Sequence, residues 1–526
     1  MKSLKFIRII LATIIYLALI FLFVDVSGWA AEHLDFLARI QLVPALLALN
    51  LVAIAILVVL TFVFGRIYCS VICPLGICQD LAIWVRKIFA GKKNRKIGIY
   101  TYKKANNKTR LVFFGAFILV VLLSLLNVMA LSLGAIIEPY SAFGRMITAL
   151  VAPIYDAGNN YLAMRSAEAG EYAYNVVSRT VPAVIFGIAA VTFVVIGWLA
   201  FRGGRTYCNT ICPVGTLLGY TSKLAWLKPR INLNKCNSCG SCQRHCKSQC
   251  IDAKAHKIDY TRCVDCFDCI NVCRQGAMEY RPSAQGYSDG SVHSDNSVSG
   301  TKSGTPENSV NKGRRMFMAS LATVSGAIVA KSAEGTVDKL TDGGLTPLKK
   351  RPSTKRNVRI VPPGAISQAH INAHCVGCQL CIQACPNGLL TASTDFATLM
   401  QPVLSYDKGY CPPECTDCSN VCPAGVFKPL DEAMKSSWKV GTAQVDLVAC
   451  LSANGTDSCG NCARHCPAGA IDMVESHAGR LVPVVYEDSC IGCGACEVHC
   501  PVGTVASMST DSPAIHVEGI SPQRFI

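Results

Sequence analysis

The sequence lacks the short motifs by which most nucleotide-dependent and hydrolytic enzymes hold their substrates. Its 526 residues contain no G-x-G-x-x-G dinucleotide fingerprint, no P-loop, no H-E-x-x-H zinc motif and no nucleophile elbow between a strand and a helix. Acidic residues are also few, 34 against 50 lysines and arginines, but no helix-turn-helix or RNA-binding pattern accompanies the resulting charge of +16. These absences argue against a substrate-converting enzyme and against nucleic acid as a partner.

Cysteine is the residue that the chain has in excess. Its 30 cysteines would suit a disulfide scaffold only in a short secreted protein. This chain is long and its cysteines recur in quartets, so metal ligation is the better interpretation.

Long apolar runs predict a membrane domain. Hydrophobic residues make up 51% of the chain, and the mean hydropathy is +0.35. Four runs, at 7–24, 42–64, 111–133 and 181–201, have about the 20 residues that a helix needs to cross a bilayer. The first run is expected to stay as a span, because no small-residue cleavage site follows it and more spans do.

The loop between the second and third runs sets the expected orientation. Residues 66–110 contain eleven lysines and arginines and a single acid, Asp80. A basic loop next to a span marks the cytoplasmic side, so this loop and the N-terminus are expected in the cytoplasm.

The membrane part contains an internal repeat. The pattern G-R-x-Y-C-x-x-I-C-P-x-G follows the second apolar run at 65–76 and the fourth at 204–215. Two helical hairpins that end in the same loop imply pseudo-symmetry. Four cysteines could then converge on one redox or metal site, since four thiolates suit a soft metal or a cluster; they are Cys69, Cys73, Cys208 and Cys212. The alternative is that they only shape tight turns at helix ends.

Two quartets follow the membrane part in residues 221–280. Each has the spacing C-x-x-C-x-x-C-x-x-x-C of bacterial two-cluster ferredoxins, in which the fourth cysteine serves the neighbouring cluster. Zinc, the alternative, is more often held by two C-x-x-C pairs. The expected ligand sets are Cys236, Cys239 and Cys242 with Cys273, and Cys263, Cys266 and Cys269 with Cys246. Lys247 and Arg274 stand where proline is usual, and Cys250 is an additional thiol.

A polar stretch separates these quartets from the rest. Residues 281–312 are rich in Ser, Gly, Asn and Asp, which is typical of a flexible linker. The following segment, 313–333, resembles a twin-arginine export signal, because Arg314 and Arg315 precede a short apolar run. It would carry a folded cluster domain across the membrane and then be cleaved or stay as a fifth span. Alternatively, the run is a cytoplasmic helix that never crosses.

Four more quartets occupy the carboxy-terminal domain, 334–526, and each ends in Cys-Pro. Their members are Cys375, Cys378, Cys381, Cys385; Cys411, Cys415, Cys418, Cys422; Cys450, Cys459, Cys462, Cys466; and Cys490, Cys493, Cys496, Cys500. The spacing predicts four further [4Fe–4S] clusters, six in all. The regular quartets lie outside and the irregular ones inside, which favours a nested exchange, first with fourth and second with third. A sequential exchange is the alternative.

The predicted architecture therefore combines two fold classes. Residues 1–220 form a membrane α-helical bundle of four spans, with a fifth possible. Residues 221–280 and 334–526 form α+β domains of the bacterial ferredoxin type, in which metal ligation supplies most of the folding energy.

These motifs resemble known membrane ferredoxins. Residues 1–280 resemble the NapH-type proteins of periplasmic nitrate reductase systems, with four spans, two G-R-x-Y-C-x-x-x-C-P loops and a cytoplasmic two-cluster module. The NosR and CcoG families share parts of this core. Residues 311–526 look like the NapG/MauM family, which joins a twin-arginine leader to four cluster motifs. The whole chain resembles a NapH–NapG fusion.

The resemblance implies a quinol dehydrogenase-type electron-transfer subunit in the bacterial inner membrane. It would take electrons from the quinone pool and pass them to a periplasmic reductase of the nitrate reductase type or to a cytochrome c partner. The N-terminal half would face the cytoplasm and the carboxy-terminal ferredoxin domain the periplasm. The alternative, implied by the NosR-like and CcoG-like relatives, is maturation or regulation of a metalloenzyme.

Quinol oxidation also requires a group that accepts protons. Glu32, His33 and Asp35 at the first expected periplasmic loop and Glu138 at the second are candidates. We select His33 as the catalytic candidate, because a free imidazole exchanges protons near neutral pH. The alternative is that all four are ordinary interfacial residues.

Overall fold

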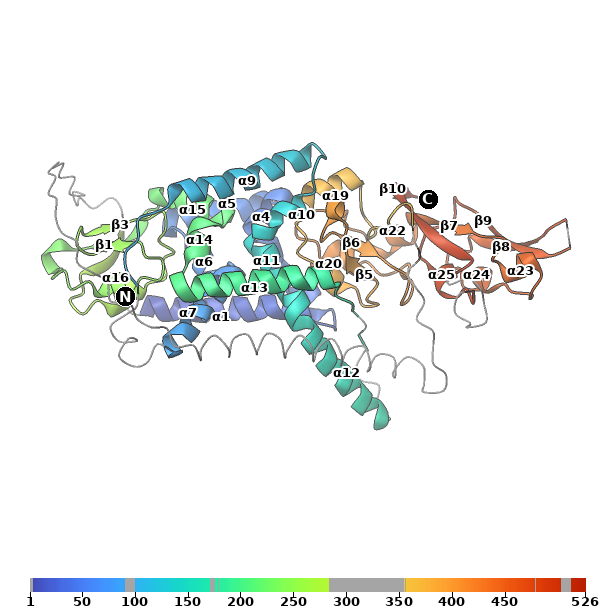
Figure 1. Ribbon diagram of the computed structural model, residues 1–526, viewed down its shortest axis with the longest axis horizontal. Helices are drawn as coiled ribbons and strands as arrows, with labels where there is room; N and C mark the ends of the chain where they lie inside the picture. Colours follow the sequence, from blue (N-terminus) through green and yellow to red (C-terminus); the bar gives the residue numbers. More distant parts are fainter. Residues whose placement is uncertain are drawn as a thin grey trace.

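The molecule is elongated and has three parts (Figure 1). The computed structural model describes residues 3–89, 100–170, 176–177, 179–282, 354, 356–477, 479–502 and 512–526. A bundle of helices runs along the middle. A first ferredoxin module, residues 226–282, lies at one end, and a second, formed by the described residues from 356 onward, lies at the other.

Three helices of the bundle are long and apolar enough to cross a membrane. They are α1 (Ser3–Val24), α9 (Asn107–Leu125) and α13 (Ala183–Gly203). Large apolar side chains on their outer faces are exposed, among them Ile14 on α1 and Val194 on α13. An exposed apolar surface of this kind suits lipid rather than water.

The second apolar run does not form the single span expected over 42–64. It is broken into α4 (Leu42–Leu47) and α5 (Leu51–Phe64), and Leu49 between them has a φ of 50°. The Asn50 side chain caps α5 by accepting the Ala53 N–H at 3.1 Å. At 14 residues, α5 is about 21 Å long and shorter than a full crossing.

The third run also ends early, and a buried helix follows it. After α9, the chain forms α10 (Leu131–Gly134), η1 (Ala135–Ile137) and α11 (Pro139–Met146), in which every residue is buried. The Glu138 carboxylate caps α11 by accepting the N–H groups of Tyr140 and Ser141. A π-helical turn (Ile147–Val151) then leads into α12 (Ala152–Glu168). Because α11 packs against α13 and α7 (Pro74–Phe89), it fills the inside of the bundle.

The internal repeat has the same structure in both copies. Gly65 ends α5 with a φ of 71°, and Gly204 ends α13 with a φ of 69°. Each glycine is followed by one short helix and then by a helix that begins at the proline of Cys-Pro. The first copy has α6 (Tyr68–Val71) and α7; the second has α14 (Thr206–Thr210), α15 (Pro213–Thr221) and η3 (Ser222–Leu224).

The first module consists of two short antiparallel sheets around its cysteine loops. Strand β1 (Leu227–Ile231) pairs with β4 (Met278–Pro282), and β2 (Ile251–Asp252) pairs with β3 (Lys257–Ile258). Its short helices are η4 (Leu233–Lys235), α16 (Ser241–His245) and α17 (Asp268–Val272).

The second module has three two-stranded antiparallel sheets. They pair β5 (Leu390–Ala392) with β6 (Pro402–Leu404), β7 (Trp438–Val445) with β10 (Ile515–Phe525), and β8 (Ile471–Glu475) with β9 (Leu481–Val485). Its helices are α19 (Gln368–His374), α20 (Leu380–Ala384), η5 (Phe396–Thr398), α21 (Asp417–Asn420), α22 (Glu432–Ser436), α23 (Leu451–Asn454), α24 (Asn461–Arg464) and α25 (Ala495–Val498).

One hydrophobic core joins the bundle to the second module. Phe23 of α1 and Phe143 of α11 belong to the same buried cluster as Val376 and Leu380 of the second module. The bundle and this module therefore share a packed interface. The expected linker 281–312, beyond Pro282, and the expected twin-arginine segment 313–333 lie outside the described residues.

Candidate metal centres

Two cavities in the first module are each lined by the four cysteines of one predicted ligand set. One, of about 390 Å³, is lined by Cys263, Cys266, Cys269 and Cys246. The other, of about 410 Å³, is lined by Cys236, Cys239, Cys242 and Cys273. The fourth cysteine of each quartet thus faces the other loop, which is the exchange that the ferredoxin spacing predicts.

A recurrent backbone conformation builds the regular loops. In each C-x-x-C-x-x-C run, the residues directly before and after the second cysteine have a positive φ. They are Ser238 and Gly240, Asp265 and Phe267, Gly377 and Gln379, and Gly492 and Gly494. The two left-handed residues curl the loop, so that three sulfurs face one space. Left-handed non-glycine residues cost energy and persist where the surroundings hold them.

Two thiols of the first module, Cys242 and Cys266, need a nearby cation to be deprotonated at neutral pH. Burial raises the pKa of Cys242 to about 11 and that of Cys266 to about 12. Bound iron would therefore displace protons from these sulfurs. Cys250, the additional thiol, is buried in the same cavity, with its sulfur 3.5 Å from that of Cys246.

The second module exchanges its cysteines sequentially, so the nested pairing expected from the sequence is wrong. A cavity of about 340 Å³ is lined by Cys411, Cys415 and Cys418 of the second quartet with Cys385 of the first. Reciprocally, the Cys381 thiol interacts electrostatically with Cys375, Cys378 and Cys422. The physical reason is that α20 packs directly on α21, which brings neighbouring quartets together.

The third and fourth quartets form a second such pair. The Cys462 thiol interacts electrostatically with Cys450, Cys459 and Cys500, and Cys493 interacts with Cys490 and Cys466. Helix α24 packs on α25, as α20 does on α21. The long spacing between Cys450 and Cys459 accommodates the extra helix α23. The two pairs meet where the Cys411 N–H donates to the Cys493 carbonyl at 2.9 Å.

Two histidines stand between the last two quartets. The rings of His465 and His499 stack at 3.8 Å, and each residue directly precedes the fourth cysteine of its quartet. Partial burial, followed by the neighbouring ring, lowers the pKa of His499 below its ordinary value. The repeated His-Cys-Pro sequence is the signal for this pair, although it does not show that the rings touch.

The second module is docked on the bundle through the loop of its first quartet. Arg145 donates to the Gly377 carbonyl at 3.3 Å, and Thr148 donates to the Gln379 side chain at 2.6 Å. Gly144 lets α11 approach closely, since a Cβ there would lie 2.5 Å from the Cys378 carbonyl oxygen. The quartet that begins at Cys375 therefore lies directly against the buried helix α11.

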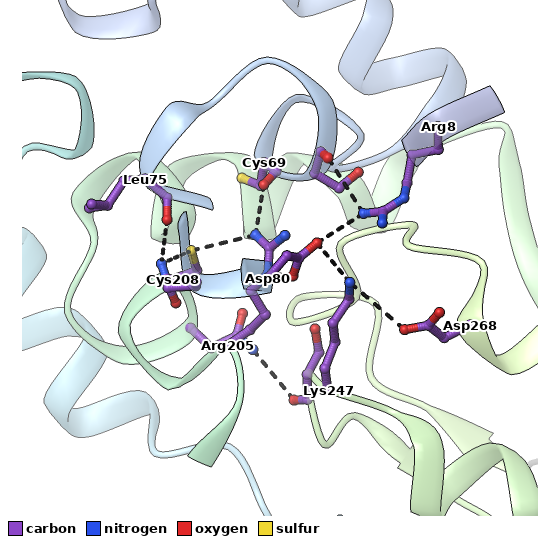
Figure 2. A network of polar contacts seen from close by, with 12 residues as sticks. Arg8, Cys69, Leu75, Asp80, Arg205, Cys208, Lys247 and Asp268 are labelled. Atoms are coloured by element: carbon purple, nitrogen blue, oxygen red, sulfur yellow. Dashed lines mark hydrogen bonds and ion pairs between the residues drawn. The ribbon is translucent and has the colours of Figure 1, made fainter. Parts of the chain in front are cut away.

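The two repeat loops meet the first module around one largely buried carboxylate, Asp80, whose side chain is 16% exposed (Figure 2). Asp80 accepts from Arg205 at 2.8 Å, Lys247 at 2.7 Å and Arg8 at 3.1 Å. Burial opposes ionisation of Asp80, but Arg205 and Lys247 outweigh it and hold its pKa well below the ordinary value. Lys247, which follows Cys246, is thus paired with Asp80, and its charge also interacts with the Cys266 thiol.

The four repeat cysteines are brought together inside the bundle. Cys69, Cys73, Cys208 and Cys212 are all buried and are not joined in disulfides. The Cys212 thiol interacts electrostatically with the other three. Among the described residues, no three His, Cys, Asp or Glu side chains are arranged as ligands of a single metal ion.

The expected proton acceptors lie in contrasting places. His33 is on the short helix α2 (Trp29–Leu34), where it is half exposed and stacks on Trp29 at 4.6 Å. Glu138 is 1% exposed and caps α11. In the neighbouring helix α3 (Phe36–Arg39), Arg39 donates to the Asn420 carbonyl, so this end of the bundle borders the second quartet of the second module.

Three charged residues that the sequence analysis did not select belong to these centres. Arg66 and Arg205 are fully buried beside the repeat cysteines, and Asp80 joins the loops to the first module. The sequence contains a signal for the two arginines and another for Asp80. The arginine is part of the repeated G-R-x-Y-C pattern, and Asp80 is the single acid in a basic loop.

Both halves of the chain match models of iron–sulfur families. A model described as a 4Fe-4S binding domain matches residues 46–96 and 183–234, which contain the two repeat loops and end before Cys236. A model described as a 4Fe-4S dicluster domain matches residues 374–426 and 457–504 of the second module. No solved structure matches the chain at a significant level.

Sequence relatives cover both halves. The methylamine utilization ferredoxin-type protein MauM of Methylophilus methylotrophus is 32% identical over 169 residues, which are 30% of this chain and 73% of the relative. The chain belongs to this family of ferredoxin-type proteins. Ferredoxin-type protein NapG of Escherichia coli is 29% identical over 204 residues, 36% of this chain and 81% of the relative. Ferredoxin-type protein NapH of Haemophilus influenzae is 24% identical over 246 residues, 44% of this chain and 68% of the relative.

The relatives and the structure together indicate the class of protein to which this chain belongs. Its matches divide between a NapH-like half and a NapG/MauM-like half, as the expected fusion requires. Apolar helices and the NapH relative indicate association with a membrane. The chain is therefore a membrane-associated iron–sulfur protein of electron transfer.

Proposed function

We propose that the protein oxidises quinol in the membrane and passes the electrons to a periplasmic respiratory reductase. The observation that carries the proposal is the placement of cysteine quartets at both ends of one apolar bundle (Figure 1). A quinol dissolved in lipid can reach the bundle, while a soluble partner can reach the far end of the second module. NapG and NapH, the relatives of the two halves, are both named as ferredoxin-type proteins.

The proposal places the two modules on opposite sides of the membrane. Helices α1, α9 and α13 are long enough to cross, and we infer that the broken pair α4–α5 makes a fourth crossing. The basic loop 66–110 puts the first module in the cytoplasm and the second in the periplasm. A twin-arginine segment at 313–333 would carry the second module across after its clusters are inserted.

Six [4Fe–4S] clusters fit the donor sets. The three cavities are each lined by the cysteines of one predicted ligand set, although their loops have different spacings. Each set brings four sulfurs to one cavity, which suits iron–sulfur clusters. When bound, such clusters take up and release one electron at a time. The six quartets would hold these clusters, and neighbouring quartets would exchange their fourth cysteines. The exchanged pairs are Cys246 and Cys273, Cys385 and Cys422, and Cys466 and Cys500.

Quinol oxidation tests the proposal directly. The full chain is purified anaerobically from membranes, and a menaquinol analogue is added while the cluster absorbance and EPR signals are recorded. About 24 iron atoms in the quartets, with bleaching by quinol, are expected. Full iron content without bleaching by quinol would overturn quinol as the donor and favour a role in metalloenzyme maturation.

His33 is proposed as the proton acceptor, and its removal should slow only the quinol reaction. Positioned acid–base groups contribute at least about 100-fold, so His33→Ala should lower the rate of quinol-driven bleaching by about that factor. Reduction by dithionite, which needs no proton acceptor, should be unchanged. His477→Ala is the matched control, because His477 is an exposed histidine in the turn after β8 and is not a candidate proton acceptor. A normal rate in His33→Ala and a slow one in Glu138→Gln would transfer the role to the buried carboxylate.

A further inference from the structure

The two repeat loops face each other across a pseudo-twofold arrangement. Arg66 of the first loop donates to the Cys208 carbonyl of the second at 3.2 Å, and Arg205 of the second donates to the Cys69 carbonyl of the first at 2.7 Å. Each arginine also lies 3.9 Å from the sulfur three residues further along its own loop. Figure 2 shows the Arg205 guanidinium between Cys69 and Cys208.

The repeated glycines permit this close approach. A Cβ at Gly76 would lie 2.2 Å from the Cys69 carbonyl oxygen, and one at Gly215 would lie 2.1 Å from that of Cys208. Each would also come within 3 Å of the arginine of the opposite loop. The motif thus encodes a single structure made by both copies, in which the cysteines of both loops share one interior.

The interior holds more positive than negative charge. Asp80 is shared by three cations, of which Arg205 faces the cysteines. The Arg66 guanidinium is fully buried and makes no salt bridge within the described part of the chain; it donates to Asn209, Thr261 and Cys208. The Asp265 carboxylate accepts from the Arg66 backbone N–H at 3.0 Å, and its charge also interacts with the guanidinium. An unbalanced buried charge is unfavourable, so the site calls for an anionic group.

The sulfurs are also supplied with hydrogen-bond donors. The Gln79 amide donates to the Cys208 sulfur at 3.1 Å, and the Gly215 N–H donates to the Cys212 sulfur at 3.3 Å. The Gln79 carbonyl oxygen and the Arg205 Nη2 are buried without a partner. Donors directed at sulfur are the means by which proteins stabilise and tune thiolate-ligated clusters.

We propose that Cys69, Cys73, Cys208 and Cys212 hold one further iron–sulfur cluster on the pseudo-twofold axis, which connects the two ferredoxin modules electronically. A cluster with four thiolate ligands carries negative charge, which the two arginines would balance. The matched 4Fe-4S binding segments contain these four cysteines and none of the six quartets.

The contacts of the site connect it to both modules. On one side, the Arg205 N–H donates to the carbonyl of Lys247, the neighbour of Cys246, at 2.9 Å. On the other side, Tyr207 donates to the Ile137 carbonyl at 2.7 Å, and Glu138 then begins α11, which ends against Cys378. One electron would pass along this path, the donor being oxidised as the acceptor is reduced, with no bond made or broken. The inference rests on the proposed electron-transfer function.

Iron content and spectra test the site. The full wild-type chain should contain about 28 iron atoms, or about 26 for a two-iron cluster, against about 24 for the six quartets alone. The double variant Cys69→Ser/Cys208→Ser should contain about 24 iron atoms and should lack one EPR component. The signals of the other clusters should remain. Cys78→Ser is the matched control, because Cys78 lies on the adjacent helix α7 and its thiol hydrogen-bonds Tyr16 instead.

Three results would overturn the proposal. They are stoichiometric zinc in the wild-type protein, a disulfide among the four cysteines under anaerobic conditions, and wild-type iron of about 24 atoms with no spectral change in the double variant. The wild-type iron and zinc counts decide the question even if the double variant fails to fold.

Electron passage across vesicles tests the connection. The full chain is placed in liposomes, and a membrane-impermeant reductant is added on the side of the first module. Clusters of the second module should be reduced in the wild type and in Cys78→Ser, but not in the double variant, in which the first module is still reduced. Reduction at the wild-type rate in the double variant would refute the connection. This test is independent of the quinol proposal. If quinol is not the donor, quinol will not bleach the clusters, but electrons will still pass from the first module to the second.

Discussion

Replacing Asp80 with alanine should destabilise the protein more than any other single change of charge. The carboxylate is the shared partner of Arg8, Arg205 and Lys247, and its loss leaves three buried cations without it. Removing one partner of a buried ion pair typically costs about 3–5 kcal/mol, because an unpaired charge remains inside. Thermal unfolding of the purified chain, followed by the loss of cluster absorbance, should show this as a large fall in Tm.

An exposed ion pair provides the control for Asp80. Glu168 and Arg165 form a similar pair, at 3.0 Å, with more than half of each side chain exposed to solvent. Pairs of this kind contribute about 0–1 kcal/mol, so Glu168→Ala should leave Tm almost unchanged. The Tm of Asp80→Asn should lie between the Tm values of Asp80→Ala and Glu168→Ala, because this variant keeps the polar contacts and loses the charge. An Asp80→Ala protein with the Tm of the wild type would refute the role given to this network.

The sequence predicts the local construction of the cluster sites well. Loop spacing alone predicts that Cys246 and Cys273 change places in the first module, because a tight loop offers three thiols and the fourth starts on the far side of the turn. The repeated G-R-x-Y-C pattern predicts two equivalent loops, and the structure has the same helix–turn–helix at both. These features depend on a few neighbouring residues, which is why a pattern can encode them.

Features that depend on packing between distant segments are hidden from the sequence. The sequential exchange in the second module follows from the packing of α20 on α21, which spacing does not describe. The break in the second apolar run rests on the backbone of Leu49 and the cap of Asn50, within a stretch that is hydrophobic throughout. Docking of the second module uses backbone carbonyls such as that of Gly377, and a carbonyl leaves no trace in a sequence.

Gly144→Ala is expected to uncouple the second module from the bundle while leaving both folded. A Cβ at this position would lie 2.5 Å from the Cys378 carbonyl oxygen and 3.0 Å from the Phe23 ring. The first of these is a backbone atom that cannot rotate away, so α11 and the cluster loop must move apart. Overpacking of this kind costs about 1–3 kcal/mol, which lowers the docking equilibrium by roughly 5- to 150-fold.

Two measurements separate uncoupling from misfolding. Hydrogen exchange at residues 376–381 should become faster, and bleaching of the second-module clusters by quinol should slow, while iron content stays at the wild-type value. Gly158→Ala is the matched control, since Gly158 lies on α12 and a Cβ there meets nothing within 4 Å. If Gly144→Ala exchanged and bleached like Gly158→Ala, the loop at Cys378 would not be the point at which electrons leave the bundle. A loss of iron in Gly144→Ala would instead show that α11 is needed to form the first quartet of the second module, because this helix packs directly on its loop.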